Sequence, residues 1–462
     1  MIEYVALAAT AAICLITFYH WQLGVWLLVL TGFLQDPIRK LVPGEPVYMV
    51  VLCAAVFGAV LVGLTLRRYR FDVSKVPGWQ PAVSTGLILL MVLVGAQLVH
   101  AYLNSSSLMV LLLGALTYYI PILAILAGFY FALRVGEAGI VRFMAFYSML
   151  CIAFTSGIYL EFLGFQWRTL GEVGPGIVIY DVGTRLEAYS GFFRSSEIAA
   201  WHVVLGSCFL LILATRTRRL SVRTLCIAGI LFLVAAGILT GRRKLIVSAV
   251  IFVTCYWCLI TLYYRNSIRI AVVVVVLGAA TFWLTASEYY GDGQRTVAYD
   301  LYVERASGVF DDISERGRTL GIGAVASAVR KHGLVGQGAG TAGQGARFSS
   351  SNLGHHYEAE GGLGRLVVEL GLLGLMVVIG VIVAFVAYLL RVMQYISLRG
   401  GSYGFICFGM VGILLTNLAH FTIASQVFSD PLVLILLGLF TGFVASGPVL
   451  VRPMETRQPV AA

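Results

Sequence analysis

Long apolar segments alternate with short polar connections along most of this 462-residue chain. Each segment approaches the roughly 20 apolar residues that a helix needs to cross a lipid bilayer. The first two are short and joined tightly at His20 and Trp21, so the pattern predicts twelve or thirteen transmembrane helices. The segments are residues 3–19, 21–35, 47–66, 81–103, 107–133, 140–163, 196–215, 224–240, 244–264, 269–287, 363–390, 403–422 and 431–450.

The composition supports a membrane protein. Hydrophobic residues make up 59% of the chain and charged residues 12%, and the mean hydropathy is +0.91. Soluble domains carry about twice that charged fraction, and a soluble core could not bury so much apolar surface. We therefore expect an all-α polytopic membrane protein with one large non-cytoplasmic loop. Residues 1–287 and 363–450 form its transmembrane helices, 288–362 the loop and 451–462 a cytoplasmic tail.

Arginine clusters beside the apolar segments predict the orientation. Threading the chain back and forth puts all of them on one side, which is the cytoplasmic side by the positive-inside rule. The formal net charge of +10 then attracts anionic lipid headgroups. No basic stripe with interleaved aromatic residues is present, which excludes nucleic acid as a partner. The clusters are Arg67, Arg68 and Arg70; Arg216, Arg218, Arg219 and Arg223; Arg265 and Arg269; Arg391 and Arg399; and Arg452 and Arg457.

One short connection opposes this charge rule. Thr240-Gly-Arg-Arg-Lys244 falls on the non-cytoplasmic side, together with connections 36–46, 164–195, 288–362 and 423–430. Its three cations either extend to lipid headgroups or form an anion site, because the planar fork of arginine matches phosphate oxygens.

The 164–195 connection adds Arg168, Arg185 and Arg194 to the same face. Arg194 is either part of an anion site or a solvated loop residue. Ser195 or Ser196 could cap the helix that follows, and the N-terminal amides of that helix would add donors for an anion.

The end of the long loop carries candidate bases. His355, His356 and Glu360 lie where the chain re-enters the membrane, and histidine and carboxylate are the usual general bases near neutral pH. Their spacing matches no standard zinc pattern, so no metal is predicted. Within the next helix, Arg365 and Glu369 are four residues apart, which favours a structural ion pair on one helix face.

Two further patterns favour structure over chemistry. The glycine-rich stretch from Gly333 to Gly340 lacks the strand–turn–helix context and the lysine of a phosphate-binding loop. The eight cysteines all fall in apolar segments, including the pair Cys255 and Cys258, and are expected to be packing residues.

Four stretches, in order, resemble the bacterial O-antigen ligase and polysaccharide polymerase superfamily. They are Gly191-Phe-Phe-Arg-Ser-Ser-Glu-Ile-Ala-Ala200, Leu239-Thr-Gly-Arg-Arg-Lys-Leu245, the segment from Arg318 to Thr341, and Glu360-Gly-Gly-Leu-Gly-Arg-Leu-Val-Val-Glu-Leu-Gly-Leu-Leu-Gly374. The chain departs from the family where His-Asn often stands at Glu360, and where Gly-Arg-Arg replaces Ser-x-Arg.

The resemblance implies a metal-independent, inverting glycosyltransferase without a cofactor. Its donor would be a polyprenyl-diphosphate-linked glycan, used at the non-cytoplasmic face of a bacterial inner membrane. The diphosphate would lie on Arg185, Arg194, Arg318 and either Arg242 or Arg243, whereas Arg168, Arg305 and Arg316 are less favoured. One of His355, His356 and Glu360 would take the proton of an acceptor sugar hydroxyl, and the residues leave open which one.

Three functions remain open from the residues. A polymerase of exopolysaccharide or O-antigen is favoured because Glu360 stands where His-Asn often does, and a ligase that joins glycan to a lipid acceptor is the alternative. A transporter of polysaccharide or lipid-linked glycan is the rival from another class, but it should show discontinuous helices and repeat symmetry, and no internal repeat is found. Other expected partners are the acceptor glycan, membrane lipids and other polysaccharide export proteins.

Overall fold

The computed structural model describes residues 2–69, 79–173, 178–181, 184–263, 319–343, 361–399 and 401–451. Ten helices in these ranges are long and apolar enough to cross a membrane. The protein is therefore a multi-pass membrane protein of the all-α class. The predicted segment 269–287 lies outside the described residues.

The chain divides into two compact units that are interleaved in sequence. Unit 1 contains Met1–Ala11, Val29–Leu52 and Val141–Asp312, and unit 2 contains Ala12–Leu28, Cys53–Ile140 and Ile313–Ala462. Four helices contribute residues to both units: α1 (Ile2–Tyr19), α2 (Trp21–Leu41), α3 (Leu52–Leu66), of which only Leu52 lies in unit 1, and α5 (Leu108–Phe162).

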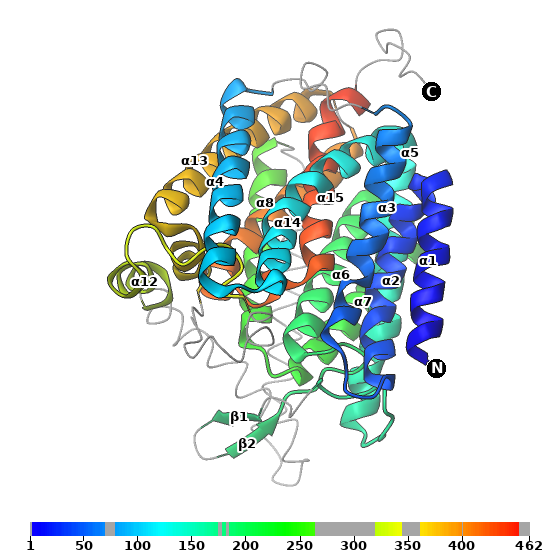
Figure 1. Cartoon of the computed structure of the whole chain (residues 1–462). Helices are drawn as coiled ribbons and strands as arrows, with labels where there is room; N and C mark the ends of the chain where they lie inside the picture. The colour runs from blue at the N-terminus through cyan, green and yellow to red at the C-terminus, as the bar shows by residue number, and fades with distance from the viewer. Residues whose placement is uncertain are drawn as a thin grey trace. The chain divides into compact units, whose positions relative to one another are not determined.

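Unit 1 is built around α6 (Ser196–Arg216), of whose apolar segment 78% is buried. Helix α7 (Leu220–Leu239) lies beside α6, and α8 (Arg243–Tyr263) follows it (Figure 1). Glycine brings α6 close to the second half of α5, because a Cβ atom at Gly206 would lie 2.9 Å from Cβ of Cys151. Strands β1 (Val178–Asp181) and β2 (Thr184–Glu187) form a small antiparallel hairpin in the connection before α6.

Unit 2 surrounds α15 (Pro431–Leu450), of whose apolar segment 89% is buried. The first half of α5 touches α15 backbone to backbone, since a Cβ atom at Gly128 would lie 2.3 Å from the carbonyl oxygen of Leu439. The remaining elements of this unit are α3 (Leu52–Leu66, from residue 53), α4 (Pro81–Ser105), η4 (Thr319–Gly323), α12 (Ala324–His332), α13 (Gly362–Arg399), α14 (Tyr403–Ile423) and η6 (Val427–Ser429), while η1 (Val47–Val51) precedes α3 in unit 1.

Two glycines break long helices without a loop. The predicted segments 107–133 and 140–163 form the single 55-residue element α5, which is interrupted at Gly136 (φ 65°, ψ −172°). Helix α13 is interrupted in the same way at Gly371 (φ 74°, ψ 178°). Only glycine adopts such positive φ values at little cost. The hydropathy pattern divides α5 into two segments near its break, but it predicts α13 as one segment, 363–390.

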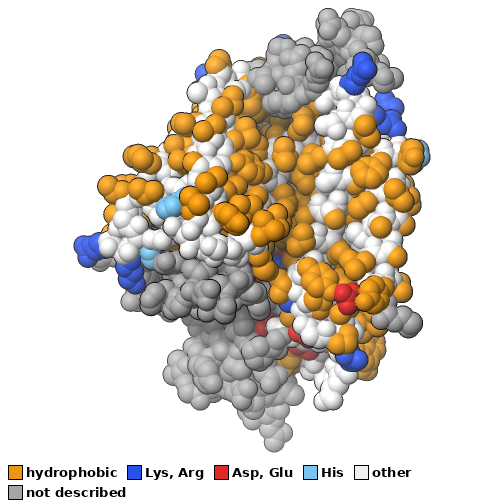
Figure 2. Space-filling model, in the orientation of Figure 1, with side chains coloured by type: hydrophobic (Ala, Val, Ile, Leu, Met, Phe, Trp, Pro, Cys, Tyr) orange, Lys and Arg blue, Asp and Glu red, His pale blue; other side chains and the backbone are white. Residues whose placement is uncertain are grey.

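The surface of the helices is apolar, as lipid contact requires. Leu15, Leu225 and Val383 are 60%, 73% and 63% exposed, and hydrophobic side chains cover much of the face seen in Figure 2. A soluble monomer rarely leaves such large apolar areas in water. These residues are therefore expected to face lipid.

The predicted loop 288–362 is described only at residues 319–343 and at 361–362, where α13 begins. Over 319–343 the chain forms η4, α12 and a glycine-rich segment, and α12 packs against α13 within unit 2. This part of the loop is thus folded against helices. The existence of one large non-cytoplasmic loop stays a prediction, as does the cytoplasmic tail.

Candidate functional site

A cluster of charged side chains surrounds the start of α6 in unit 1. It joins the end of α2, the end of α5, the 164–195 connection and the turn between α7 and α8, so three of the predicted non-cytoplasmic connections meet here. We call it the polar cluster; its members are Asp36, Lys40, Glu161, Glu172, Arg194, Ser196, Glu197, Arg242 and Lys244.

Ser195 is the N-cap of α6. Its Oγ accepts a hydrogen bond of 3.4 Å from the backbone N–H of Ile198, as expected for a capping serine. Ser196 has a different role, because its N–H and its hydroxyl both donate to Oε1 of Glu172, at 2.8 and 2.5 Å. The amide that the sequence offered to an external anion is thus bonded to a carboxylate of the protein.

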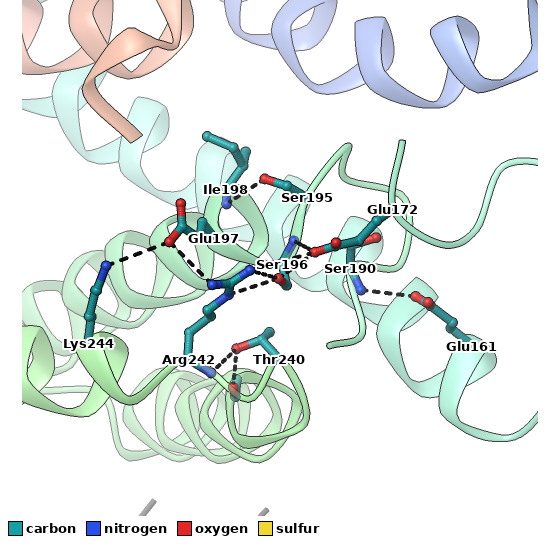
Figure 3. Close-up of polar contacts among 11 residues, drawn as sticks. Glu161, Glu172, Ser190, Ser195, Ser196, Glu197, Ile198, Thr240, Arg242 and Lys244 are labelled. Atoms are coloured by element: carbon teal, nitrogen blue, oxygen red, sulfur yellow. Dashed lines mark hydrogen bonds and ion pairs between the residues drawn. The ribbon is translucent and has the colours of Figure 1, made fainter. Parts of the chain in front are cut away.

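Arg242 reaches across to the same helix start. Its Nε and Nη2 donate to Oγ of Ser196 at 2.9 and 2.8 Å, and its Nη1 donates to Oε1 of Glu197 at 3.3 Å (Figure 3). The turn that aims Arg242 needs Gly241, whose φ is 65°, and the hydroxyl of Thr240 accepts the amide of Arg242 at 3.4 Å. Lys244 lies next to it, with Nζ 3.7 Å from Glu197.

Arg194 is held by Asp36 at the end of α2. Oδ2 of Asp36 accepts the backbone N–H of Arg194 at 3.1 Å, and Nη1 of Arg194 lies 3.5 Å from Oδ1 of Asp36. The Arg194 side chain is only 16% exposed. The alternative of a solvated loop residue is therefore wrong for Arg194.

Lys40 is a buried cation beyond the apolar part of α2. Its ammonium donates to the carbonyl oxygens of Thr169, Gly191 and Phe193, at 3.2, 2.8 and 2.6 Å. Burial lowers the pKa of Lys40 to about 8, against the opposing effect of nearby carboxylates, of which Asp36 acts most strongly. The group is therefore still protonated at neutral pH, when its three N–H bonds match three acceptors.

Glu161, at the end of α5, holds the loop before α6. Its Oε2 accepts the N–H groups of Ser190 and Gly191 at 3.0 and 2.6 Å. Gly191 has a φ of 58°, and a Cβ atom there would lie 2.5 Å from the backbone nitrogen of Ile158. Glycine is thus required for this loop to lie against α5.

The cations of the polar cluster are matched by carboxylates. Arg194 pairs with Asp36, Arg242 with Glu197 and, at 3.9 Å, with Glu172, and Lys244 with Glu197. Such pairing holds the guanidinium groups of Arg194 and Arg242 in fixed positions. Sequence reasoning missed the acids and Lys40, although each lies at the end of an apolar segment or in a connection on the same predicted face.

Several predicted site residues cannot be placed in this cluster. Arg185 lies in β2 and Arg243 begins α8, but their side chains are outside what the structure describes. Arg168 is exposed in the connection after α5. The other predicted residues lie outside the described part of the chain: Arg305, Arg316, Arg318, His355, His356 and Glu360.

A second charged group lies in unit 2. Nε of Arg365 is 3.0 Å from Oε1 of Glu369, whose Oε2 accepts the hydroxyl of Tyr118 at 2.6 Å. Arg365 also donates to Oγ of Ser429 and to the carbonyl of Ser425. Arg365 and Glu369 are 3% and 0% exposed, and a pair so fully enclosed fits the structural role that the spacing predicts.

The glycine-rich stretch is a packing element of unit 2. Gly336, Gly338 and Gly340 have φ values of 83°, 103° and 91°, and Cβ atoms there would lie within 2.7 Å of the backbone of α13, α4 and α5. Gln337 N–H donates to the carbonyl of Val368 at 2.7 Å. These contacts fit the expectation that the stretch is no phosphate loop.

Comparison with models of known protein families gave no match, and comparison with curated proteins gave none either. Fold and site together define the class: a multi-pass membrane protein with a partly buried network of arginines, lysines and carboxylates at one end of a helix bundle. Within the described ranges, no three His, Cys, Asp or Glu side chains are grouped to hold a metal ion.

Proposed function

We propose that this protein is a membrane glycosyltransferase that moves glycan from a polyprenyl-diphosphate carrier to an acceptor sugar hydroxyl, as an exopolysaccharide or O-antigen polymerase. The contact of Arg242 with Ser196 carries the proposal. It joins two of the four stretches of the family resemblance, 239–245 and 191–200. Two stretches whose contacting residues are 46 positions apart in sequence are therefore in direct contact.

The chemistry of the donor suits this site. The leaving diphosphate gains negative charge in the transition state, and fixed cations in a water-poor site stabilise such charge strongly. Three N–H groups of Arg242 donate to Ser196 and Glu197. Because a guanidinium has five, Nη1 and Nη2 each keep one hydrogen beyond these contacts that can point to a phosphate oxygen.

The remaining roles rest on the residues and the resemblance. Arg185, Arg194, Arg243 and Arg318 are the further proposed ligands of the diphosphate. His355, His356 or Glu360 is the proposed base for the acceptor hydroxyl. The reaction would take place at the surface of a bacterial inner membrane, because a polyprenyl tail stays in lipid. The positive-inside rule puts the 241–243 connection, and with it the reaction, on the non-cytoplasmic side.

Transfer by purified protein in nanodiscs tests the proposal. A synthetic polyprenyl-diphosphate oligosaccharide should be converted to longer glycans with release of polyprenyl diphosphate, both read by mass spectrometry. Arg242→Ala should lower the transfer rate by about 10²–10³-fold, the usual effect of losing one preorganised donor to a developing charge.

Arg223→Ala is the matched control. Arg223 is a partly buried arginine of the same unit at the other end of α7, where it donates to the carbonyl of Thr217. It should leave transfer unchanged. An active wild-type protein whose transfer is unaffected by Arg242→Ala would place the diphosphate elsewhere.

A transporter is the second candidate because α13 is discontinuous at Gly371, and broken helices form substrate sites in transporters. Other groups of the protein, however, form hydrogen bonds with the backbone at this break. Leu372 N–H donates to the carbonyl of Leu334 at 2.9 Å, and the Gln97 side chain reaches the carbonyl of Leu370 at 3.5 Å. In proteoliposomes, a transporter would move the lipid-linked glycan without changing its length. A ligase would instead attach glycan to a supplied lipid acceptor.

A further inference from the structure

Residues 190–196 connect the hairpin region to α6 and carry Arg194. In the described part of the chain, their backbone is bonded to charged side chains that come from three separate places: the end of α2, the end of α5 and the 164–173 connection. We call Asp36, Lys40, Glu161 and Glu172 the clamp.

Carboxylates of the clamp accept the amides of this segment. Glu161 takes the N–H groups of Ser190 and Gly191. Asp36 takes that of Arg194 and Glu172 that of Ser196. Four of the seven residues of the segment thus donate to a carboxylate, and such charge-assisted bonds are about twice as strong as neutral ones.

Lys40 binds carbonyl oxygens of the same segment. Its ammonium donates to Gly191 and Phe193, which come three residues and one residue before Arg194 along the chain, and to Thr169 in the preceding connection. Lys40 is 5% exposed. An ammonium is the only side-chain group with three donors spread around one atom, so neither arginine nor an apolar residue reproduces these three bonds.

A buried ionic network is a poor way to add stability, because apolar side chains of similar size often stabilise a fold equally well or better. What such a network supplies is a fixed geometry. Here the fixed object is a seven-residue segment that holds Arg194 and begins the helix to which Arg242 is bonded. The segment is therefore set before any ligand arrives, as preorganised charge stabilisation requires.

We propose that Lys40 is a positioning residue of the donor site: by binding two carbonyls of the turn that leads directly into Arg194, it holds the Arg194 guanidinium, together with Asp36, in place for the donor diphosphate. The assignment rests on the proposed function. Because Lys40 would act on transfer through the Arg194 guanidinium, its effect can be distinguished from a general contribution to folding.

A double-mutant cycle in nanodiscs tests this. Lys40→Met should lower kcat/KM for the lipid-diphosphate donor by about 10–10²-fold, the scale of a 1 Å misplacement. In an Arg194→Ala background the same change should cost at most about twofold, because the group that Lys40 positions is already absent. Fully multiplicative losses would overturn the proposal.

Hydrogen exchange gives a readout that needs no activity. Lys40→Met should speed exchange in residues 190–196 while leaving α14 and α15, in the other unit, unchanged. Lys331→Met makes the same chemical change at an exposed position of α12 and should alter neither exchange nor transfer. Unchanged exchange in residues 190–196 of Lys40→Met would also overturn the proposal.

Asp36→Asn is the second variant, for the case in which Lys40→Met does not fold. It keeps an acceptor for the amide of Arg194 but removes the ion pair, and should lower kcat/KM only when Arg194 is present. If wild-type protein transfers no glycan, the proposed function fails, and the exchange experiment still decides whether the clamp holds the segment.

Discussion

Each carboxylate of the polar cluster accepts a hydrogen bond from another residue of the protein. Glu172 is the most informative, because its carboxylate lies on the hydroxyl and amide of Ser196 and 3.9 Å from Arg242. An anion of the protein thus sits beside the arginine proposed to bind a diphosphate.

Removing the charge of Glu172 should tighten donor binding. Glu172→Gln keeps an oxygen acceptor for Ser196 but no longer neutralises Arg242, so the attraction of Arg242 for a diphosphate rises. We expect the Kd of the lipid-diphosphate donor, measured by fluorescence anisotropy, to fall by about 3–10-fold, given that two charges about 4 Å apart interact by roughly 1 kcal/mol in water. Weaker binding would mean that Glu172 serves mainly to hold Ser196.

Lys40 predicts an alkaline limit on transfer. Its pKa is lowered to about 8, so it is charged below that pH and neutral above it. The neutral amine has two N–H groups for three carbonyls, and the segment around Arg194 loosens. The carboxylates facing it are Asp36, Glu161, Glu45 and Glu172.

The pH profile of transfer should therefore fall as pH rises through about 8. Lys40→Arg stays charged at all these pH values, since arginine does not deprotonate in proteins. Its transfer should be lower at neutral pH but free of this alkaline fall. The same fall in Lys40→Arg would assign it to another group.

Elements of unit 2 approach one another through glycine. The stretch around Gly338 passes so close to α4 that a Cβ atom there would lie 2.5 Å from the backbone nitrogen of Ala101, and its φ is 103°. By contrast, a Cβ atom at Gly380 in α13 would meet nothing within 4 Å.

Gly338→Ala should destabilise unit 2. Unfavourable φ and a backbone clash each cost about 1–3 kcal/mol, so the thermal midpoint in detergent should fall by several degrees. Gly380→Ala should leave it unchanged or raise it slightly, because alanine is the better helix former. Equal midpoints for the two variants would show that the stretch moves aside easily.

At the scale of the whole molecule, the fold is set by exclusion of polar backbone from lipid. Helices satisfy their own backbone groups, which is why they cross membranes. The charge rule then orients them, and within unit 1 the 36–46, 164–195 and 241–243 connections meet at one end, away from Arg223 at the other end of α7.

Single cysteines at positions 168 and 218 should report opposite sides of the membrane. Arg168 and Arg218 are both exposed, and the charge rule predicts Arg218 to be cytoplasmic. In intact cells, an impermeant maleimide should label the Arg168→Cys variant and not Arg218→Cys. The reverse labelling would invert the whole topology.

The sequence by itself determined the membrane class, because lipid solvates apolar side chains and a helix of about 20 such residues matches the thickness of the bilayer core. It also predicted the serine cap of α6 and the enclosed pair of Arg365 and Glu369, since capping and i,i+4 contacts are local. It singled out Arg194 and the pair Arg242 and Arg243 because they lie on the face that the positive-inside rule leaves poor in cations.

Only the tertiary structure decided which groups those arginines face. Asp36 lies 158 positions before Arg194, and no local pattern links an acid at the end of one helix to the loop before another. Local sequence patterns did not predict the breaks at Gly136 and Gly371 either. With 51 glycines in the chain, the residue type permits a positive φ at each, but packing of neighbouring helices selects where it occurs.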